Sequence, residues 1–121
     1  MTVRRDQMRM LDRLIRVRSV RARLAMATLG RVQARQVAEA ALLDRVTALL
    51  AGGGAEAGVV AADAAAARAS ADAMLGRLSD DVGRRLAVTA DERRSLGEAL
   101  GRARAAVDAA VARRAEREIA P

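Results

Sequence analysis

A run of three glycines near the middle of the chain divides it into two long segments that share one apolar pattern. Residues 52–54 are all glycine, and Gly58 follows shortly after. Each glycine in a helix costs about 1 kcal/mol relative to alanine, so the run predicts the end of a first helix. We expect a helix over about 3–51, a Gly-rich turn over about 52–58 and a second helix over about 59–119.

The first segment carries mostly apolar residues at alternating steps of three and four over nearly seven heptads. Ten of the 13 positions in the series are apolar. This spacing lines one side of a helix and is typical of a coiled-coil seam. Its polar members, Arg18, Gln36 and Glu39, are expected either to set the register or to face a partner. The predicted seam is Met8, Leu11, Ile15, Arg18, Ala22, Ala25, Leu29, Val32, Gln36, Glu39, Leu43, Val46 and Leu50.

The second segment has a similar series with one irregularity. Two successive four-residue steps, from Leu78 to Val82 to Leu86, predict a stutter in the heptad. Ser79 and Thr89 lie nearby and are candidate helix caps. We expect a continuous second helix with a bend within about 76–89, and a true break into two helices is the alternative. The predicted seam is Val60, Ala64, Ala67, Ala71, Met74, Leu78, Val82, Leu86, Thr89, Arg93, Leu96, Leu100, Ala103, Val107 and Ala110.

The apolar residues of this chain are small. It contains no Phe, Trp or Tyr, and its apolar content is mainly Ala, Leu and Val. Such side chains fill the thin layer between two helices but supply little area for a wide core. A short connection makes the two helices antiparallel neighbours. We therefore predict an all-α fold, a single antiparallel coiled-coil hairpin over residues 1–121. Its stability is expected to be modest, or to depend on binding to a partner.

The sequence contains no residue pattern typical of a catalytic, cofactor-binding or metal-binding site. With no His, Cys or Tyr, acid–base catalysis would fall to carboxylates. The adjacent acidic pairs at 80–81 and 91–92 point in different directions on a helix and are better explained as caps and surface charge. The Gly-rich run lacks the Lys and Ser/Thr of a phosphate-binding loop, and Gly97-x-x-x-Gly101 predicts at most a close helix contact. We predict no catalytic, cofactor-binding or metal-binding residue, no small-molecule substrate and no enzymatic activity.

The charge is concentrated at one end of the expected hairpin. Residues 1–23 carry eight Arg and two Asp, residues 102–121 carry five Arg and three acidic residues, and residues 24–101 sum to −1. An antiparallel hairpin brings the first two stretches together with a net charge of +8. Cations at a helix N-terminus, such as Arg4 and Arg5, oppose the helix dipole. An acidic partner at this end would satisfy them.

The sequence also restricts location and nucleic-acid binding. Its longest uncharged stretches run to about ten residues, whereas a membrane span needs about 20, and no secretory signal is recognised. We expect a cytoplasmic protein. Arginines can neutralise phosphates, but the absence of aromatics to stack on bases disfavours nucleic acid as the partner. Non-specific duplex binding and a generic coiled-coil scaffold are the alternatives to a protein-coupling role.

Residues 11–25, which read LDRLIRVRSVRARLA, resemble the opening of the FliJ/YscO family. These are small coiled-coil proteins of flagellar and virulence type III export systems. The resemblance extends over about residues 11–40 in sequence and over nearly the whole chain in expected architecture. It implies a stalk that enters the export ATPase hexamer, promotes its assembly or turnover and links it to the membrane export gate proteins.

The resemblance also implies which residues bind. Export chaperones are further implied partners, and contact with the membrane would be only through partners. By motif position, the residues expected to face the ATPase ring are Arg16, Arg18, Arg21 and Arg23. Three apolar residues outside the predicted seam are expected to accompany them, namely Leu14, Val17 and Leu24.

Overall fold

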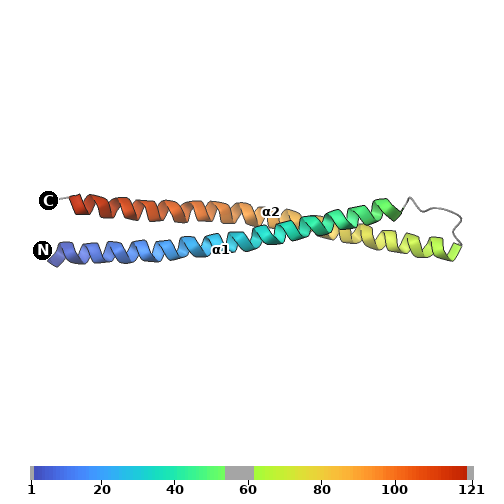
Figure 1. The fold of residues 1–121 in the computed structure, drawn as a ribbon, viewed down its shortest axis with the longest axis horizontal. Helices are drawn as coiled ribbons and strands as arrows, with labels where there is room; N and C mark the ends of the chain where they lie inside the picture. Colours follow the sequence, from blue (N-terminus) through green and yellow to red (C-terminus); the bar gives the residue numbers. More distant parts are fainter. Residues whose placement is uncertain (1, 54–61, 120–121) are drawn as a thin grey trace. The chain divides into compact units, whose positions relative to one another are not determined.

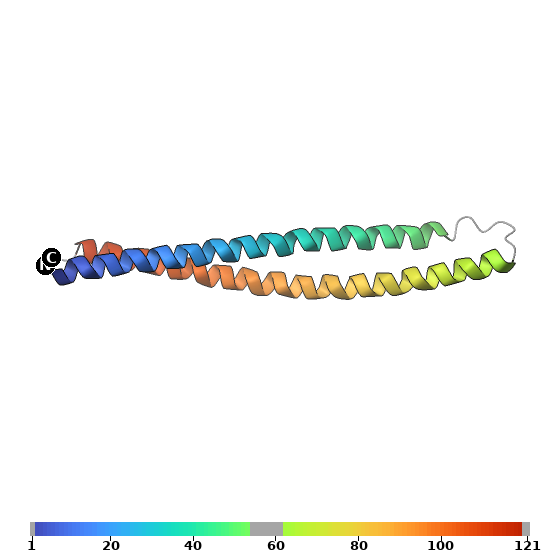
Figure 2. The same cartoon turned by 90° about the horizontal axis from the view of Figure 1, so that it is seen from below.

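The protein is a helical hairpin. The computed structural model describes residues 2–53 and 62–119, and all of these residues lie in two helices. Helix α1 spans Thr2–Gly53 and helix α2 spans Ala62–Ile119. The two helices run antiparallel and pack against each other (Figures 1 and 2). The predicted all-α, two-helix fold is confirmed.

The helix boundaries differ slightly from the expected ones. The Gly-rich composition predicts a turn at Gly52 and Gly53, but they are the last two residues of α1. Their N–H groups face carbonyls four residues earlier in the helix, and such bonds offset part of the conformational cost of glycine. The rest of the expected turn, 54–58, and the expected start of the second helix, 59–61, lie outside the described residues.

The chain divides into two compact units, each with a segment of both helices. The terminal unit comprises Met1–Val32 and Arg93–Pro121, and the middle unit comprises Gln33–Glu92. In sequence, the terminal unit contains sixteen arginines and six acidic residues, whereas the middle unit contains six arginines and nine acidic residues. Their formal charges are therefore +10 and −3.

The predicted α1 seam is correct along its whole length. All 13 of its residues are buried or half-buried. The most buried members are Val32 in the terminal unit and Val46 in the middle unit, each 3% exposed. The prediction succeeded because a 3–4 spacing of mainly apolar residues leaves one face of the helix that can pack against α2.

The predicted α2 seam is correct from Val82 onward, whereas its earlier described members are exposed, namely Ala64, Ala67, Ala71, Met74 and Leu78. Val82, Thr89, Leu100 and Ala110 are buried, and the intervening seam residues are half-buried with the exception of Arg93, which is exposed. These buried positions keep the spacing of a heptad seam. Thr89, a candidate helix cap by sequence, instead lies inside α2 and is only 2% exposed.

The predicted stutter in α2 is wrong. Met74 is 64% exposed and Leu78 is 38% exposed, whereas their neighbours Leu75 and Ser79 are half-buried. Steps from 75 to 79, 82, 86 and 89 alternate four and three, so the heptad continues without interruption. In the sequence the two apolar residues Met74 and Leu78 favour the wrong face, but a thin seam also accepts a small polar residue such as Ser79. Helix α2 is continuous through 76–89, and the stutter no longer gives a reason for a bend.

The corrected seam predicts unequal costs for two neighbouring substitutions. Leu75→Ala should lower the free energy of unfolding by about 1–2 kcal/mol, because it removes a half-buried side chain. Met74→Ala should change it by less than about 0.5 kcal/mol, because that side chain is already exposed. Urea unfolding followed by circular dichroism measures both. A larger loss for Met74→Ala would restore the original seam.

The Gly97-x-x-x-Gly101 spacing does not produce a close helix contact. Both glycines are exposed, and a Cβ atom placed on either one would meet no other atom within 4 Å. These glycines therefore have no packing role in the described structure.

Candidate protein-binding surface

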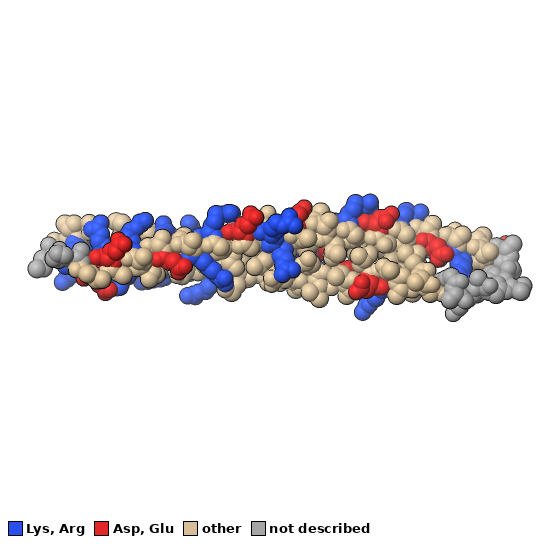
Figure 3. Space-filling view, turned by 90° about the horizontal axis from the view of Figure 1, so that it is seen from above, with Lys and Arg blue, Asp and Glu red and all other residues tan. Residues whose placement is uncertain are grey.

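The terminal unit presents a group of unpaired arginines on α1. Their side chains are exposed and make no hydrogen bond or ion pair with any described residue. Figure 3 shows one face of the molecule with its arginines in blue. An exposed guanidinium keeps all five of its N–H donors available for a partner. The group consists of Arg5, Arg9, Arg13, Arg16, Arg21 and Arg23.

The structure separates Arg18 from the other three arginines that the family resemblance singled out. Arg16, Arg21 and Arg23 are exposed, whereas Arg18 is half-buried in the seam. Its Nη1 donates a hydrogen bond of 2.9 Å to the backbone carbonyl of Ala106 on α2. Arg18 therefore has a structural role within the terminal unit. This agrees with the first alternative for polar seam residues, which is to set the register, rather than with the second, which is to face a partner.

The three expected apolar companions also differ from one another. Leu14 is half-buried, whereas Val17 and Leu24 are 43% and 63% exposed. Two residues that were not predicted from the sequence, Arg13 and Val20, share a shallow surface hollow with Val17. The spacing of 13, 17 and 20 is a helical i, i+4, i+7 pattern and would have identified them. The hollow is lined by Arg13, Arg16, Val17, Val20 and Arg21.

Part of the basic charge of the terminal unit is satisfied internally. The Nη2 atom of Arg4 donates hydrogen bonds of 3.1 Å to the carbonyls of Arg117 and Glu118. These carbonyls lie at the C-terminus of α2, where helix carbonyls lack intrahelical partners and where a cation is electrostatically favourable. Arg4, which opposes the dipole of its own helix, thus complements that of α2.

A second set of contacts joins the same ends of the two helices. Arg114 forms a hydrogen-bonded ion pair with Asp12 and a 3.2 Å ion pair with Glu118. The hydrogen bond to Asp12 and its negative charge raise the pKa of Arg114 above the usual arginine value, so this side chain stays charged. Arg117 also donates a 2.8 Å hydrogen bond to the amide oxygen of Gln7. These side chains hold the hairpin ends together.

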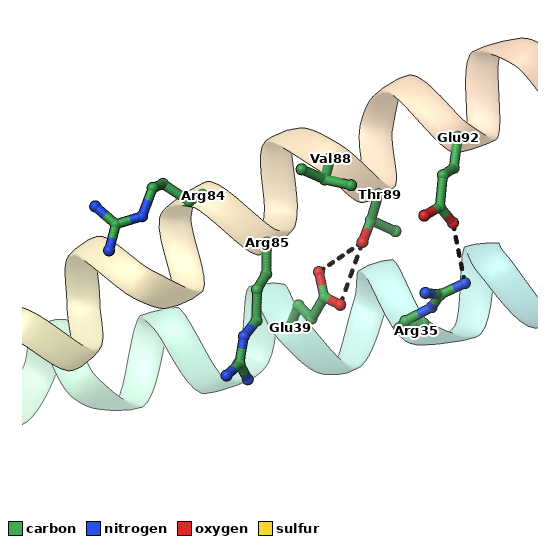
Figure 4. Close-up of a pocket in the computed structure, with 7 residues that line it drawn as sticks. All are labelled: Arg35, Glu39, Arg84, Arg85, Val88, Thr89 and Glu92. Carbon is green, nitrogen blue, oxygen red and sulfur yellow. Dashed lines mark hydrogen bonds and ion pairs between the residues drawn. The ribbon is translucent and has the colours of Figure 1, made fainter.

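The middle unit contains a polar contact across the seam. The Thr89 hydroxyl donates to the Glu39 carboxylate, with oxygen–oxygen distances of 2.9 and 3.2 Å (Figure 4). Beside it, Arg35 forms a 3.1 Å ion pair with Glu92. These pairs join α1 to α2 and satisfy one another, so they are suited to fixing the register of the helices.

Two further features concern ligands and membranes. Within residues 2–53 and 62–119, no group of three or more acidic, His or Cys side chains could hold a metal ion. Over the same residues, neither α1 nor α2 includes an apolar stretch of the length a membrane span requires.

Comparison with protein-family models, curated proteins and solved structures finds no match to this chain. The binding roles predicted for the seven α1 residues therefore stay predictions. Among these, the structure groups Arg16, Val17 and Arg21 around one hollow.

Proposed function

We propose that this chain is a non-enzymatic coiled-coil protein that binds an acidic protein assembly through the exposed arginines of α1. The observation that carries the proposal is the set of six exposed α1 arginines in the terminal unit that have no partner among the described residues, in a unit of formal charge +10. A second supporting observation is that Arg4 and Arg114, which lie beside them, are already paired internally. The unpaired arginines of α1 are thus available to a partner, as are the exposed Arg102, Arg104 and Arg113 of α2.

Carboxylates are the groups that these arginines suit best on a protein surface. The planar guanidinium can donate two parallel hydrogen bonds to a carboxylate, and its charge draws an acidic surface into contact. Such a partner would also relieve the mutual repulsion of arginines placed close together on one helix. The binding step needs no reaction at this surface, and any catalysis belongs to the partner.

The export ATPase of a type III flagellar or virulence system is the proposed partner. This identification comes from the resemblance of residues 11–25 to the FliJ/YscO family, and a cytoplasmic stalk of that kind would regulate the ATPase hexamer from its centre. Contacts with export gate proteins and export chaperones belong to the same proposal, with no residue assigned to them.

Charge reversal tests the proposal. We expect the triple variant Arg16→Glu, Arg21→Glu, Arg23→Glu to bind purified export ATPase about 100-fold more weakly than the intact protein, because attraction at three positions becomes repulsion. Arg18 is left unchanged, since its bond to Ala106 supports the hairpin. Pull-down followed by surface plasmon resonance measures the loss, and circular dichroism checks that the helices persist.

The matched control reverses three exposed arginines of the middle unit, Arg45, Arg77 and Arg84. It changes the net charge by the same amount, so a general effect of charge would weaken binding equally in both variants. We expect this control to stay within about threefold of the intact protein, as is usual for charges outside a contact. Retention of duplex DNA in place of the ATPase, or of neither, would replace the proposal with the DNA-binding or scaffold alternative.

A further inference from the structure

The outward side of α1 carries a second apolar stripe, which the hairpin does not use. Its members, called the outer stripe, are Val3, Met10, Val17, Val20 and Leu24, which are 67%, 69%, 43%, 47% and 63% exposed. Four of them recur every seventh residue. Met10 follows the seam residue Met8 by two positions, which is about 200° around a helix. The outer stripe therefore lies on nearly the opposite side of α1 from the seam.

Arginines border the outer stripe in a regular pattern. Arg9, Arg16 and Arg23 each precede a member of the seven-residue repeat, which is the g position of a heptad whose a position is that member. Arg21 follows Val20 and occupies the e position. All four are exposed and unpaired within the described part of the chain. In coiled coils these flanking positions select the partner helix by charge.

Building on the proposed function, we propose that the outer stripe docks an amphipathic α-helix of a protein partner, with acidic residues on both sides of its apolar stripe. The partner helix would pack its apolar residues on Val17, Val20 and Leu24 and place its carboxylates beside the bordering arginines. The outer stripe extends over about three heptads, which is long enough for helix pairing when α1 is already held in place by α2.

The arrangement of charge argues against a second copy of this chain as the occupant. Parallel pairing through the outer stripe would set Arg16 opposite Arg21 of the other copy, since g positions face e positions of the next heptad. Antiparallel pairing would set the row of Arg9, Arg16 and Arg23 against an identical row. Both arrangements bring like charges together and are disfavoured.

A membrane surface also fits less well than a helix. Helices that lie in a membrane interface usually combine a broad apolar face with Trp, Phe or Leu. The outer stripe is one or two residues wide, and the charged Arg13 occupies a d position of its heptad. The chain also has no aromatic residue. A narrow stripe bordered by arginines matches the surface of a single acidic helix.

Binding of a designed peptide tests the inference directly. The probe is a fluorescently labelled helix of about three heptads with Leu at a and d and Glu at e and g, whose own charges oppose self-association. We expect it to bind the full chain and to bind Leu24→Glu and Val17→Glu at least about 10-fold more weakly by fluorescence anisotropy. The same peptide with Lys at e and g should not bind.

Matched controls are available on the same helix. Leu49 and Val37 lie in the middle unit and are 60% and 71% exposed, close to or above the exposure of Leu24 and Val17. We expect Leu49→Glu and Val37→Glu to bind the acidic peptide within about twofold of the intact protein. Equal losses in all four variants would overturn the inference, since added negative charge alone would then explain them.

Other outcomes would assign the outer stripe to a different occupant and equally overturn the inference. One is Leu24-dependent binding to vesicles of phosphatidylcholine and phosphatidylglycerol without binding to the peptide. Another is a dimer in sedimentation equilibrium that Leu24→Glu dissociates.

The inference and the proposed function can fail separately. If the Arg16, Arg21, Arg23 reversal abolishes ATPase retention while Leu24→Glu changes neither that retention nor peptide binding, the docking helix is wrong and the proposed function stands. If peptide binding depends on Leu24 but no export ATPase is retained by the intact protein, the docking surface stands and the ATPase is the wrong partner.

Discussion

Replacing Val82 with Asp is expected to lower the free energy of unfolding of the middle unit by about 3–5 kcal/mol, enough to unfold it. Val82 is 1% exposed and is the largest side chain in the described chain that is almost completely buried. A carboxylate at this position would lose its hydration inside an apolar seam. Only five apolar residues are buried among those described, and only Val46 and Val82 of these lie in the middle unit, so its seam has little other burial to offset that loss.

Val88→Asp is the matched control for Val82→Asp. Val88 lies on the same helix and in the same unit but is 57% exposed, so its replacement should cost less than about 0.5 kcal/mol. Hydrogen exchange measured by mass spectrometry should show that amide protection in residues 33–53 and 62–92 is lost in Val82→Asp and kept in Val88→Asp. Equal protection in the two variants would show that Val82 does not hold the unit together.

The apolar pattern predicts the buried face of α1 but not that of the first part of α2. In α1 the seam consists largely of Leu, Val, Ile and Met, so the apolar period identified the buried face. Near the start of α2, the predicted seam residues Met74 and Leu78 are exposed, whereas Leu75 and Ser79 are half-buried. Two apolar residues marked the wrong face there and only one marked the correct face, although the heptad spacing counted back from Val82 would have given the correct one.

The contacts of the candidate site could not be predicted without knowing how the two helices pair. The heptad placed Arg18 in the seam, but its acceptor, the Ala106 carbonyl, depends on the register of α2 against α1. The same holds for the ion pair of Asp12 and Arg114, which are about a hundred residues apart in sequence. Helical periodicity fixes which residues share a face of one helix, but it does not fix how far two helices are shifted along each other.

Removing the hydroxyl of Thr89 alone is expected to lower the free energy of unfolding by about 1–2 kcal/mol, whereas removing it together with the Glu39 carboxylate should restore or exceed the original stability. Thr89→Val leaves the Glu39 carboxylate, half-buried in the seam, without its donor. In the double variant Glu39→Leu, Thr89→Val, no polar group is left unsatisfied, and apolar side chains fill the layer. Replacing buried polar pairs in this way is often neutral or stabilising.

Urea unfolding of the intact protein, both single variants and the double variant forms a double-mutant cycle for this pair. We expect a coupling of about 1 kcal/mol or more between Glu39 and Thr89. Thr47→Val is the control, since the Thr47 hydroxyl is exposed and bonds only the Leu43 carbonyl within α1. If the losses of the two single variants simply add, the pair is not coupled. A stabilised double variant would mean that this polar contact is kept for the register of the helices, at some expense of stability, which suits a protein whose binding surface depends on how α1 is held by α2.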